Sequence, residues 1–298
     1  SLHDALPIYR VVKSLSVAKK ENNNLITAIK YPTDTIKIYK NIILLVFEGV
    51  TSKNFENEFI NIDNGFYKRF NKNTKYYNNY FTNNLDSYTS LLALISSIQV
   101  PYRCYADVDL YENVNKEHNL VEYFKLNGYK SLFVSTFEYQ PFIPSKSFWD
   151  DIYTRKNLDI TDKFITIGSS RMEMATEDKS AIDKIVDYTK NNNKSFILHE
   201  MAYGHSPEWR ATTGISQLKY YNDYLIELTD KLNNFNLLDS TLLVIVSDHG
   251  DRSKIAKKEN YRIPLLIFGK NITNSIDSTF LSHLNFSSII FNSLSVTY

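Results

Sequence analysis

The sequence predicts an α/β fold built around a mostly parallel sheet, and three observations support this class. Five short runs are continuously apolar, as expected of strands that are buried on both faces. Helical patterns, with apolar residues three and four positions apart, lie between these runs. Polar residues suited to chemistry follow several of the runs directly. Strands that alternate with helices form a parallel sheet covered by helices, so one large α/β domain is expected.

The first predicted strand is Asn41 to Phe47, and it ends at Glu48-Gly49. Four later segments share its pattern, at residues 131–135, 195–199, 241–248 and 262–268. Ligands of open α/β sheets bind beyond the carboxyl ends of the strands. That rule selects Glu48 after the first strand, His199 at the end of the third, and Asp248-His249 at the end of the fourth.

Four helices are predicted between the strands. One begins near Ser87 and runs through an apolar stretch to Ser97, with three hydroxyl side chains at its start. The others span residues 120–127, which stop before Gly128, and residues 178–191 and 212–235. Residues 1–40 have no clear period, and we expect them to form a lead-in or linker segment. Residues 41–298 are expected to form a single domain.

Charge and cysteine content exclude several classes of protein. Lys plus Arg number 34 against 33 Asp plus Glu, so the chain lacks the basic excess that a nucleic-acid-binding protein needs. The single cysteine, Cys104, excludes an internal disulfide and a zinc site built from several cysteines. No apolar run reaches 18 residues, so no transmembrane helix is expected within this chain.

The segment Ser247-Asp248-His249-Gly250 carries the clearest chemical signal. A carboxylate and an imidazole leave a buried strand side by side, and such donors suit Zn²⁺ or Mn²⁺. The alternative is a surface turn whose aspartate caps a helix. Glu48 favours a metal site, because a charge directly after an apolar run is costly to bury without a partner.

Phe47-Glu48-Gly49 and Ser247-Asp248-His249-Gly250 together resemble the alkaline phosphatase superfamily, particularly its sulfatase-like branch. The resemblance covers about residues 41–295. A single glutamate, in place of the aspartate pair of true sulfatases, resembles the phosphoethanolamine and phosphoglycerol transferases. The resemblance implies a three-layer α/β/α sandwich with a mixed, mostly parallel sheet. It also implies one divalent metal, with zinc expected and Mn, Mg or Ca as alternatives, bound by Glu48, Asp248, His249 and the nucleophile.

The nucleophile is expected at the start of the helix near Ser87, where the helix dipole and a metal both favour an alkoxide. Ser87 fits the family's spacing, with Ser90 three positions later and Ser96-Ser97 closing the apolar run. Thr89 fits the preference of the transferases for threonine but not that spacing. We favour Ser87, which would also bind the metal, and keep Thr89 as the alternative. A third interpretation is that Ser87 only caps the helix.

True sulfatases mature a Cys or Ser within a Cys/Ser-x-Pro-x-Arg motif into formylglycine. The corresponding stretch here, Ser87 to Leu91, lacks both Pro and Arg, and Cys104 lies far from the helix start. These departures favour phosphoryl transfer over sulfate-ester hydrolysis.

Several residues are candidates for contact with the substrate. His199 to Pro207 resembles a His-x-x-Gly-Ser-His-x-Pro stretch of the transferases, which implies that His205 contacts the phosphate or protonates the leaving group. His199 is a second candidate, with a role in holding a loop as the favoured alternative. Arg252, two positions after Gly250, could receive an anionic group. His283, in a Ser-His-Leu-Asn stretch similar to a late family motif, is a further candidate with a structural alternative.

The resemblance implies an enzyme that moves a phosphoethanolamine or phosphoglycerol head group from a phospholipid to a glycan or lipid acceptor. The expected intermediate is a covalent Ser or Thr ester. Alternatives are a sulfatase or phosphodiesterase on the same fold, a non-catalytic binding relative, and an α/β protein of another class. Residues 41–298 would be the catalytic domain, placed in the periplasm at the outer face of the inner membrane. The chain begins with Ser1, so we expect membrane attachment through a segment outside it.

Overall fold

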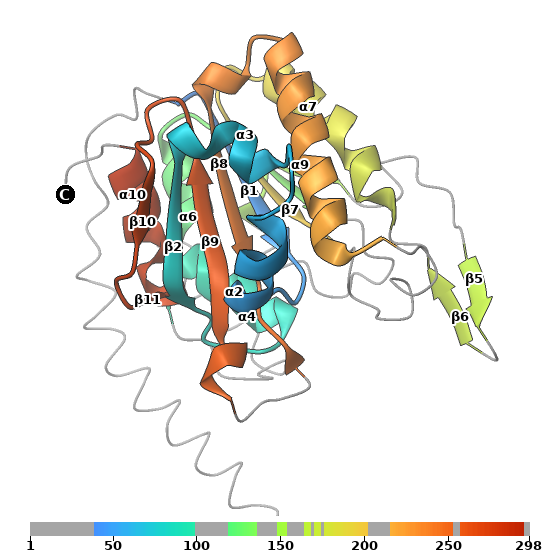
Figure 1. The fold of residues 1–298 in the computed structure, drawn as a ribbon. Coiled ribbons are helices and arrows are strands. Elements are labelled where there is room, and N and C mark those ends of the chain that lie inside the picture. Colours follow the sequence, from blue (N-terminus) through green and yellow to red (C-terminus); the bar gives the residue numbers. More distant parts are fainter. Residues whose placement is uncertain are drawn as a thin grey trace, which may run out of the picture.

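The central sheet of the protein carries the order β10-β2-β9-β8-β1-β7-β3-β4, with β11 also paired to β2. The computed structural model describes residues 39–98, 119–135, 148–153, 164–167, 170–173, 176–201, 215–252 and 257–294. Its strands are β1 (Asn41–Phe47), β2 (Thr74–Phe81), β3 (Lys130–Ser135), β4 (Asp151–Tyr153), β5 (Phe164–Ile167), β6 (Ser170–Glu173), β7 (Ser195–Glu200), β8 (Thr241–Ser247), β9 (Arg262–Phe268), β10 (Ser275–Asp277) and β11 (Leu281–Ser282). Strands β5 and β6 form a separate antiparallel pair, away from the main sheet in Figure 1.

Strand β1 lies at the centre of the sheet, and all seven of its residues are buried. It runs parallel to β8 on one side and to β7 on the other. A strand covered on both faces and paired on both edges has no position for a charged side chain, which explains its unbroken apolar run. Its first charged residue, Glu48, follows where the strand ends.

The sheet is mixed because β9 is antiparallel to both of its neighbours, β8 and β2. The pairs made by β1, β3, β4, β7 and β8 among themselves are parallel. The predicted mixed, mostly parallel sheet is therefore confirmed. All five predicted strands are present, with bounds within about one residue of those expected.

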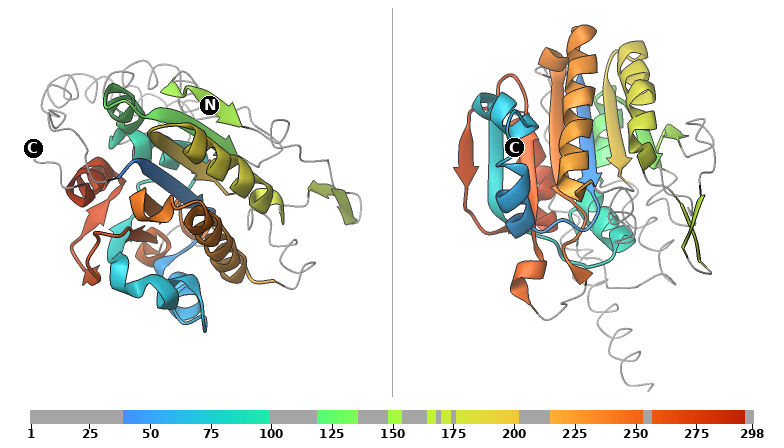
Figure 2. Two further views of the ribbon diagram at one scale, coloured as in Figure 1. Left: turned by 90° about the horizontal axis from the view of Figure 1, so that it is seen from above. Right: turned by 45° about the vertical axis from the view of Figure 1, so that its right-hand side comes forward.

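Helices cover both faces of the sheet and complete three layers, as Figures 1 and 2 show. The helices are α2 (Ser52–Asn54), α3 (Phe66–Phe70), α4 (Ser87–Ser96), α6 (Leu120–Leu126), α7 (Ser180–Asn191), α9 (Gln217–Asn234) and α10 (Phe286–Ser293). Short helical turns lie at η2 (Phe55–Phe59), η3 (Asn71–Asn73), η6 (Thr176–Lys179), η7 (Leu238–Ser240), η9 (Lys258–Asn260) and η10 (His283–Asn285). Helices α4, α6 and α10 share one apolar cluster with Leu44 and Val46 of β1. Helices α3, α7 and α9 share another with Leu45 and Phe47, so alternate residues of one strand face opposite layers.

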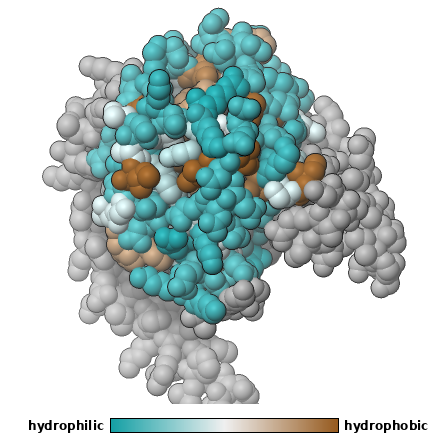
Figure 3. Space-filling view, viewed as in Figure 1, coloured by the Kyte–Doolittle hydropathy of each residue, from teal (hydrophilic) through white to brown (hydrophobic). Residues whose placement is uncertain are grey.

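Helix α9 illustrates how the outer layers divide apolar from charged residues. Leu218, Leu225 and Leu232 are buried against the sheet. Lys219 pairs with Asp223 on the opposite side of the helix, at 2.9 Å between Nζ and Oδ2. Figure 3 shows the result, a largely hydrophilic face with separate hydrophobic spots. No helix in the described part of the chain combines the length and apolarity needed to cross a bilayer.

Strand β2 was not predicted from the sequence. Its residues, TKYYNNYF, mix tyrosines with asparagines and have no continuous apolar run. The tyrosines nevertheless bury their rings, and Tyr76 and Tyr80 are among the largest fully buried side chains of the described residues. A β-bulge between Tyr77 and Tyr80 shifts the register against β9 and breaks the simple alternation that marks a strand in the sequence.

Candidate metal and nucleophile site

The register of the two central strands brings Glu48 next to Asp248 and His249. Phe47 of β1 is the partner of Ser247 of β8, so the residues that follow each strand leave the sheet side by side. One ligand atom from each of the three side chains lies within 4.8 Å of the others, and all three residues are buried. The oxygens and nitrogen thus meet the distance requirement for a shared metal, whose bonds are about 2 Å long.

Backbone contacts hold the two strand ends together beneath this group. Asp248 donates its amide to the Phe47 carbonyl at 3.0 Å, and its Oδ1 accepts from the Gly49 amide at 3.0 Å. The Ser247 hydroxyl accepts from the Val50 amide at 2.8 Å. Gly49 has a φ of +64°, a left-handed conformation that glycine adopts without the strain of a Cβ. The turn after β1 is therefore tied to the turn after β8.

Hydrogen bonding sets the tautomer that His249 needs as a ligand. Its Nδ1 lies 2.7 Å from the Gly250 carbonyl, to which it can only donate. A proton on Nδ1 leaves the lone pair on Nε2 for a metal. Nε2 lies 3.2 Å from Oε1 of Glu48 and 3.4 Å from Oδ2 of Asp248. The imidazole thus directs its ligating atom at both carboxylates.

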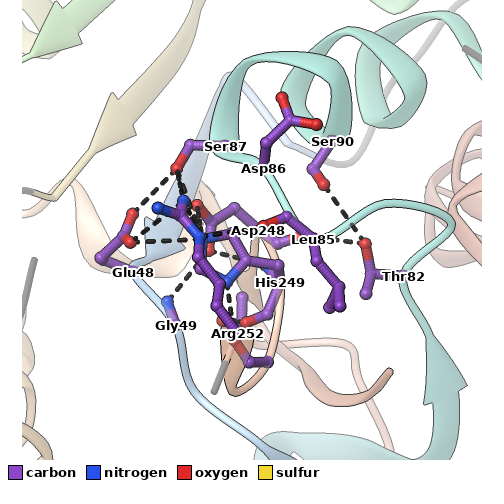
Figure 4. Close-up of polar contacts among 12 residues, drawn as sticks. Glu48, Gly49, Thr82, Leu85, Asp86, Ser87, Ser90, Asp248, His249 and Arg252 are labelled. Atoms are coloured by element: carbon purple, nitrogen blue, oxygen red, sulfur yellow. Dashed lines mark hydrogen bonds and ion pairs between the residues drawn. The ribbon is translucent and has the colours of Figure 1, made fainter. Parts of the chain in front are cut away.

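Ser87 is the first residue of α4, and its hydroxyl joins the same group. Its Oγ donates to Oε2 of Glu48 at 3.1 Å and lies 3.5 Å from Nε2 of His249. The cap of α4 is Asp86, whose carboxylate accepts from the Thr89 amide at 2.9 Å. Ser87 is therefore not the helix cap, and its hydroxyl is directed at Glu48 and His249 (Figure 4).

Thr89 occupies a different position. It is buried, and its hydroxyl donates to Oδ2 of Asp86. In Figure 4 the Asp86 carboxylate points away from Glu48 and the other metal-site residues. Of the two predicted nucleophiles, the structure brings Ser87 and not Thr89 to the candidate metal ligands.

Arg252 also reaches the group, from a more open side. Its Nε donates to the Leu85 carbonyl at 2.9 Å, and one terminal nitrogen donates to Oγ of Ser87 at 2.8 Å. The same nitrogen lies 3.5 Å from Oε1 of Glu48 and contacts Nε2 of His249. The Arg252 side chain is 45% exposed and that of Glu48 only 6%.

Burial and crowding of like charges shift the pKa values of Asp248 and His249. Burial, reinforced by repulsion from Glu48, raises the pKa of Asp248 to about 7. Burial opposes protonation of His249, but Asp248 and Glu48 together outweigh it and raise its pKa to about 9. A divalent cation would relieve this crowding, and its binding would require His249 to release a proton.

Glu200, at the end of β7, was missed by the sequence analysis, which selected its neighbour His199. Burial, followed by repulsion from Asp248 and Glu48, raises the pKa of Glu200 to about 8. Its Oε2 accepts from the Ser135 hydroxyl at 3.1 Å. The signal was present, because Glu200 stands at the carboxyl end of a buried strand, as Glu48 does.

Two residues of α9 were also missed. The Tyr221 hydroxyl accepts from the Glu48 amide at 3.1 Å, and its ring stacks on Phe47 with centroids 4.1 Å apart. Gln217 donates to the Glu48 carbonyl. Both residues position the backbone at the end of β1. An amphipathic helix pattern gives no indication of such contacts, because they depend on where the helix packs.

Two further predicted site residues, His199 and His283, are not members of the Glu48, Asp248 and His249 group. His199 and His283 are both 0% exposed, which argues against the predicted contact of either ring with a substrate. Nδ1 of His199 lies 2.9 Å from the Tyr224 hydroxyl, and His283 packs on the ring of Tyr80. Burial lowers the pKa of each imidazole to about 3, so both are neutral at pH 7. His205, Cys104 and residues 1–38 lie outside the described residues.

Known structures share this fold at low sequence identity. A protein of the alkaline phosphatase superfamily from Vibrio parahaemolyticus matches with a TM-score of 0.68 and 18% identity, covering 89% of this chain and 68% of that one. The lipoteichoic acid synthase LtaP from Listeria monocytogenes matches with a TM-score of 0.64 and 17% identity, over 87% and 72% of the two chains. The C-terminal periplasmic domain of EptC from Escherichia coli, in complex with Zn, matches with a TM-score of 0.58 and 14% identity, over 88% and 84%.

Sequence comparison gives the family. No curated protein matches the chain in sequence. The family model described as Sulfatase matches residues 40–295, nearly the whole chain after the predicted lead-in. A match to this family supports an enzyme. The buried residues Glu48, Asp248 and His249 of this chain could bind a divalent metal. The chain belongs to the sulfatase family.

Proposed function

We propose that this protein is a metal-dependent phosphoryl-group transferase whose nucleophile is Ser87. The observation that carries the proposal is the position of the Ser87 hydroxyl. It lies at the N-terminus of α4, 3.1 Å from Glu48 and 3.5 Å from His249. Thr89, the alternative, instead donates its hydroxyl to Asp86.

Glu48, Asp248, His249 and the Ser87 hydroxyl would hold the metal. Three oxygens and one nitrogen suit Zn²⁺, with Mn²⁺, Mg²⁺ or Ca²⁺ as alternatives. When bound, the metal supplies activation of a hydroxyl and stabilisation of negative charge. The hydrogen bond from His249 Nδ1 to the Gly250 carbonyl keeps the ring in the orientation that this role needs.

The reaction would proceed by two displacements at phosphorus. In the first, Ser87 Oγ forms a bond to the phosphorus of a head-group phosphodiester, and the bond from phosphorus to the diacylglycerol oxygen breaks. The Ser87 hydroxyl proton already points at the Glu48 carboxylate, which can accept it. The leaving alkoxide takes a proton from a donor, for which the resemblance to the transferases offers His205. In the second, an acceptor oxygen bonds to phosphorus and the bond from phosphorus to Ser87 Oγ breaks. Ser87 takes back its proton from Glu48, and the acceptor hydroxyl gives its own proton to the group that protonated the leaving alkoxide.

Helix α4 contributes to the first displacement through its N-terminus. Ser87 is its first residue, so negative charge that develops on Oγ lies at the positive end of the helix dipole. Arg252, whose guanidinium lies 2.8 Å from the same oxygen in this structure, is the residue we assign to the anionic phosphate.

The donor we propose carries a phosphoethanolamine or phosphoglycerol head group, and the acceptor is a glycan or lipid. The single glutamate at the end of β1 supports this choice by its resemblance to such transferases. So do the names of two structural neighbours, a phosphoethanolamine transferase EptC and a lipoteichoic acid synthase LtaP. On this proposal residues 41–298 are the catalytic domain, placed at the extracytoplasmic face of the membrane that supplies the lipid.

Mass spectrometry of the zinc-loaded protein tests the proposal. After incubation with phosphatidylethanolamine or phosphatidylglycerol, we expect a head-group phosphate adduct on the peptide that contains Ser87. Ser87→Ala should abolish the adduct, and Thr89→Ala, two residues along the same helix, should retain it. An adduct on Thr89, or one that persists in Ser87→Ala, would contradict the assignment.

Hydrolysis of a sulfate ester or of a phosphodiester, on the same fold, is the competing function. A panel of aryl phosphodiesters and aryl sulfates separates the two. Turnover of aryl sulfate in preference to the phosphodiester would favour a sulfatase, although Ser87 to Leu91 lacks the Pro and Arg of the maturation motif. Absence of turnover and of bound zinc would favour a non-catalytic relative.

A further inference from the structure

The guanidinium of Arg252 and a metal ion require the same atoms. One terminal nitrogen of Arg252 lies 2.8 Å from Oγ of Ser87 and 3.5 Å from Oε1 of Glu48, and it contacts Nε2 of His249. These are three of the atoms that would bind the metal. Figure 4 shows the guanidinium directed into the space that Glu48, Ser87 and His249 enclose.

The contact with His249 makes the two cations mutually exclusive. Nδ1 of the ring donates to the Gly250 carbonyl, so Nε2 offers the one lone pair through which the imidazole can bind a metal. A guanidinium nitrogen in contact with Nε2 occupies the position from which a metal would bind this atom. Two cations that share these ligands would also repel each other, because a guanidinium is always charged.

The Arg252 side chain is exposed enough to move away from the candidate metal ligands. Its side chain is 45% exposed, and that of His249 only 2%. Away from the ligands, its Nε donates to the Leu85 carbonyl at 2.9 Å. The ligands therefore stay fixed by the ends of β1 and β8, whereas the arginine can swing outward.

We propose that Arg252 is a built-in competitor of the metal, which must withdraw from Ser87, Glu48 and His249 before the ion binds. This inference rests on the metal site of the proposed function. It assigns Arg252 a regulatory role in addition to substrate binding, because withdrawal and the arrival of an anionic phosphate would be linked. The guanidinium that leaves the ligands becomes available to the substrate.

The competition lowers the apparent affinity for metal in a measurable way. If the guanidinium blocks the ligands in about nine-tenths of the molecules, the apparent Kd for zinc is about tenfold above its intrinsic value. Arg252→Met, which keeps an unbranched stem and removes the charge, should therefore bind zinc about tenfold more tightly. Arg252→Lys, which keeps a charge but loses the planar fork, should give an intermediate Kd.

The experiment measures the zinc Kd of the full chain by competition with a chromophoric chelator. Arg262→Met is the matched control, since Arg262 also pairs with a glutamate, at 3.3 Å from Glu56, but outside the metal ligands. Its zinc Kd should equal that of the wild type. In chelator, Arg252→Met should have a lower Tm than the wild type, and zinc should raise its Tm by more.

The inference is overturned if the zinc Kd of Arg252→Met equals that of the wild type or is higher. Either result would show that the arginine does not compete with the metal. Failure of the proposed function is distinguishable, because wild type, Arg252→Met and Glu48→Gln would then all lack tight zinc binding. Zinc binding by Arg252→Met alone, lost again in the Glu48→Gln, Arg252→Met double variant, would support strong competition.

Discussion

Gly250 separates the ligand His249 from the chain that continues to Arg252. A Cβ at this position would lie 1.9 Å from the Asn260 carbonyl oxygen and 3.2 Å from Cγ2 of Thr51. The obstacle is backbone, so it cannot move as a flexible side chain would. The glycine therefore allows η9 to pack against the metal-binding turn.

We expect Gly250→Ala to lower the free energy of unfolding by about 3 kcal/mol, because the overlap must displace η9. Gly128→Ala is the control, since Gly128 has a φ of +82° but nothing within 4 Å of the added Cβ. Its cost should be the conformational strain alone, about 1 kcal/mol. Urea unfolding gives both values, and equal costs would contradict the close approach at Gly250.

Residues of the site differ in how far the sequence reveals them. Glu48, Asp248 and His249 were predictable because these ionisable residues directly follow buried strands, where a charge without a partner is costly. Ser87 needed the helix start as well. The family's spacing favoured Ser87 but left Thr89 open as an alternative, and the direction of the Thr89 side chain, set by the cap at Asp86, separates the two residues in the structure.

Helix α4 carries the proposed nucleophile, and its cap fixes where the helix begins. Asp86 accepts from the Thr89 amide, so Ser87 becomes the first helical residue. Helix α6 has an equivalent cap, in which Asn119 accepts from the Glu122 amide at 2.9 Å. The two caps make the same interaction, but α6 carries no site residue.

Removing either cap should cost about 1–2 kcal/mol of stability. Asp86→Ala and Asn119→Ala are therefore expected to shift the urea midpoint similarly. Only Asp86→Ala should also reduce formation of the Ser87 adduct, because loss of the cap frays the turn that positions the hydroxyl. Equal adduct formation in both variants, at matched fractions of folded protein, would argue against this role of the cap.

Elements with a single dominant signal were the ones that the sequence predicted well. The central strands are apolar throughout, and α7 and α9 have clear three- and four-residue spacing. Strand β2 was not predicted, because its buried side chains are tyrosines and the run is interrupted by Asn78, Asn79 and a bulge. Its place beside β9 depends on pairing with residues 181 to 194 positions away, which a local pattern cannot encode.

At the scale of the whole molecule, a chain of net charge +1 concentrates acidic groups at one edge of its sheet. Burial, Asp248 and Glu48 raise the pKa of Glu200 to about 8, whereas burial lowers the pKa of His199 and His283 to about 3. The two histidines bind protons less tightly when folded than when unfolded. Their contribution to stability is therefore present above about pH 6.5 and is lost as pH falls toward 3.

The pKa of Glu200 shifts in the opposite direction, so its ionisation lowers the stability of the folded protein at alkaline pH. Its pKa rises from 4.5 to about 8 on folding, so the folded protein binds this proton more tightly than the unfolded chain. The stabilisation is full below pH 4.5 and is lost as pH rises through 8. Between these limits the free energy of unfolding should fall by up to about 1.4 kcal/mol per pH unit on account of Glu200.

Glu200→Gln should remove this dependence, because an amide keeps the shape and the polar contact with Ser135 but does not ionise. In chelator, we expect the variant to match the wild type near pH 5 and to exceed its Tm by several degrees at pH 8.5. Asp239→Asn, at an exposed residue that pairs with Lys270, is the control and should leave the pH profile unchanged.

A Glu200→Gln protein that follows the wild type at every pH would mean that Glu200 is already ionised, with the neighbouring carboxylates too far away to oppose it. A profile that flattens as expected would instead establish that this edge of the sheet stores unfavourable negative charge, which is the condition that favours a divalent cation.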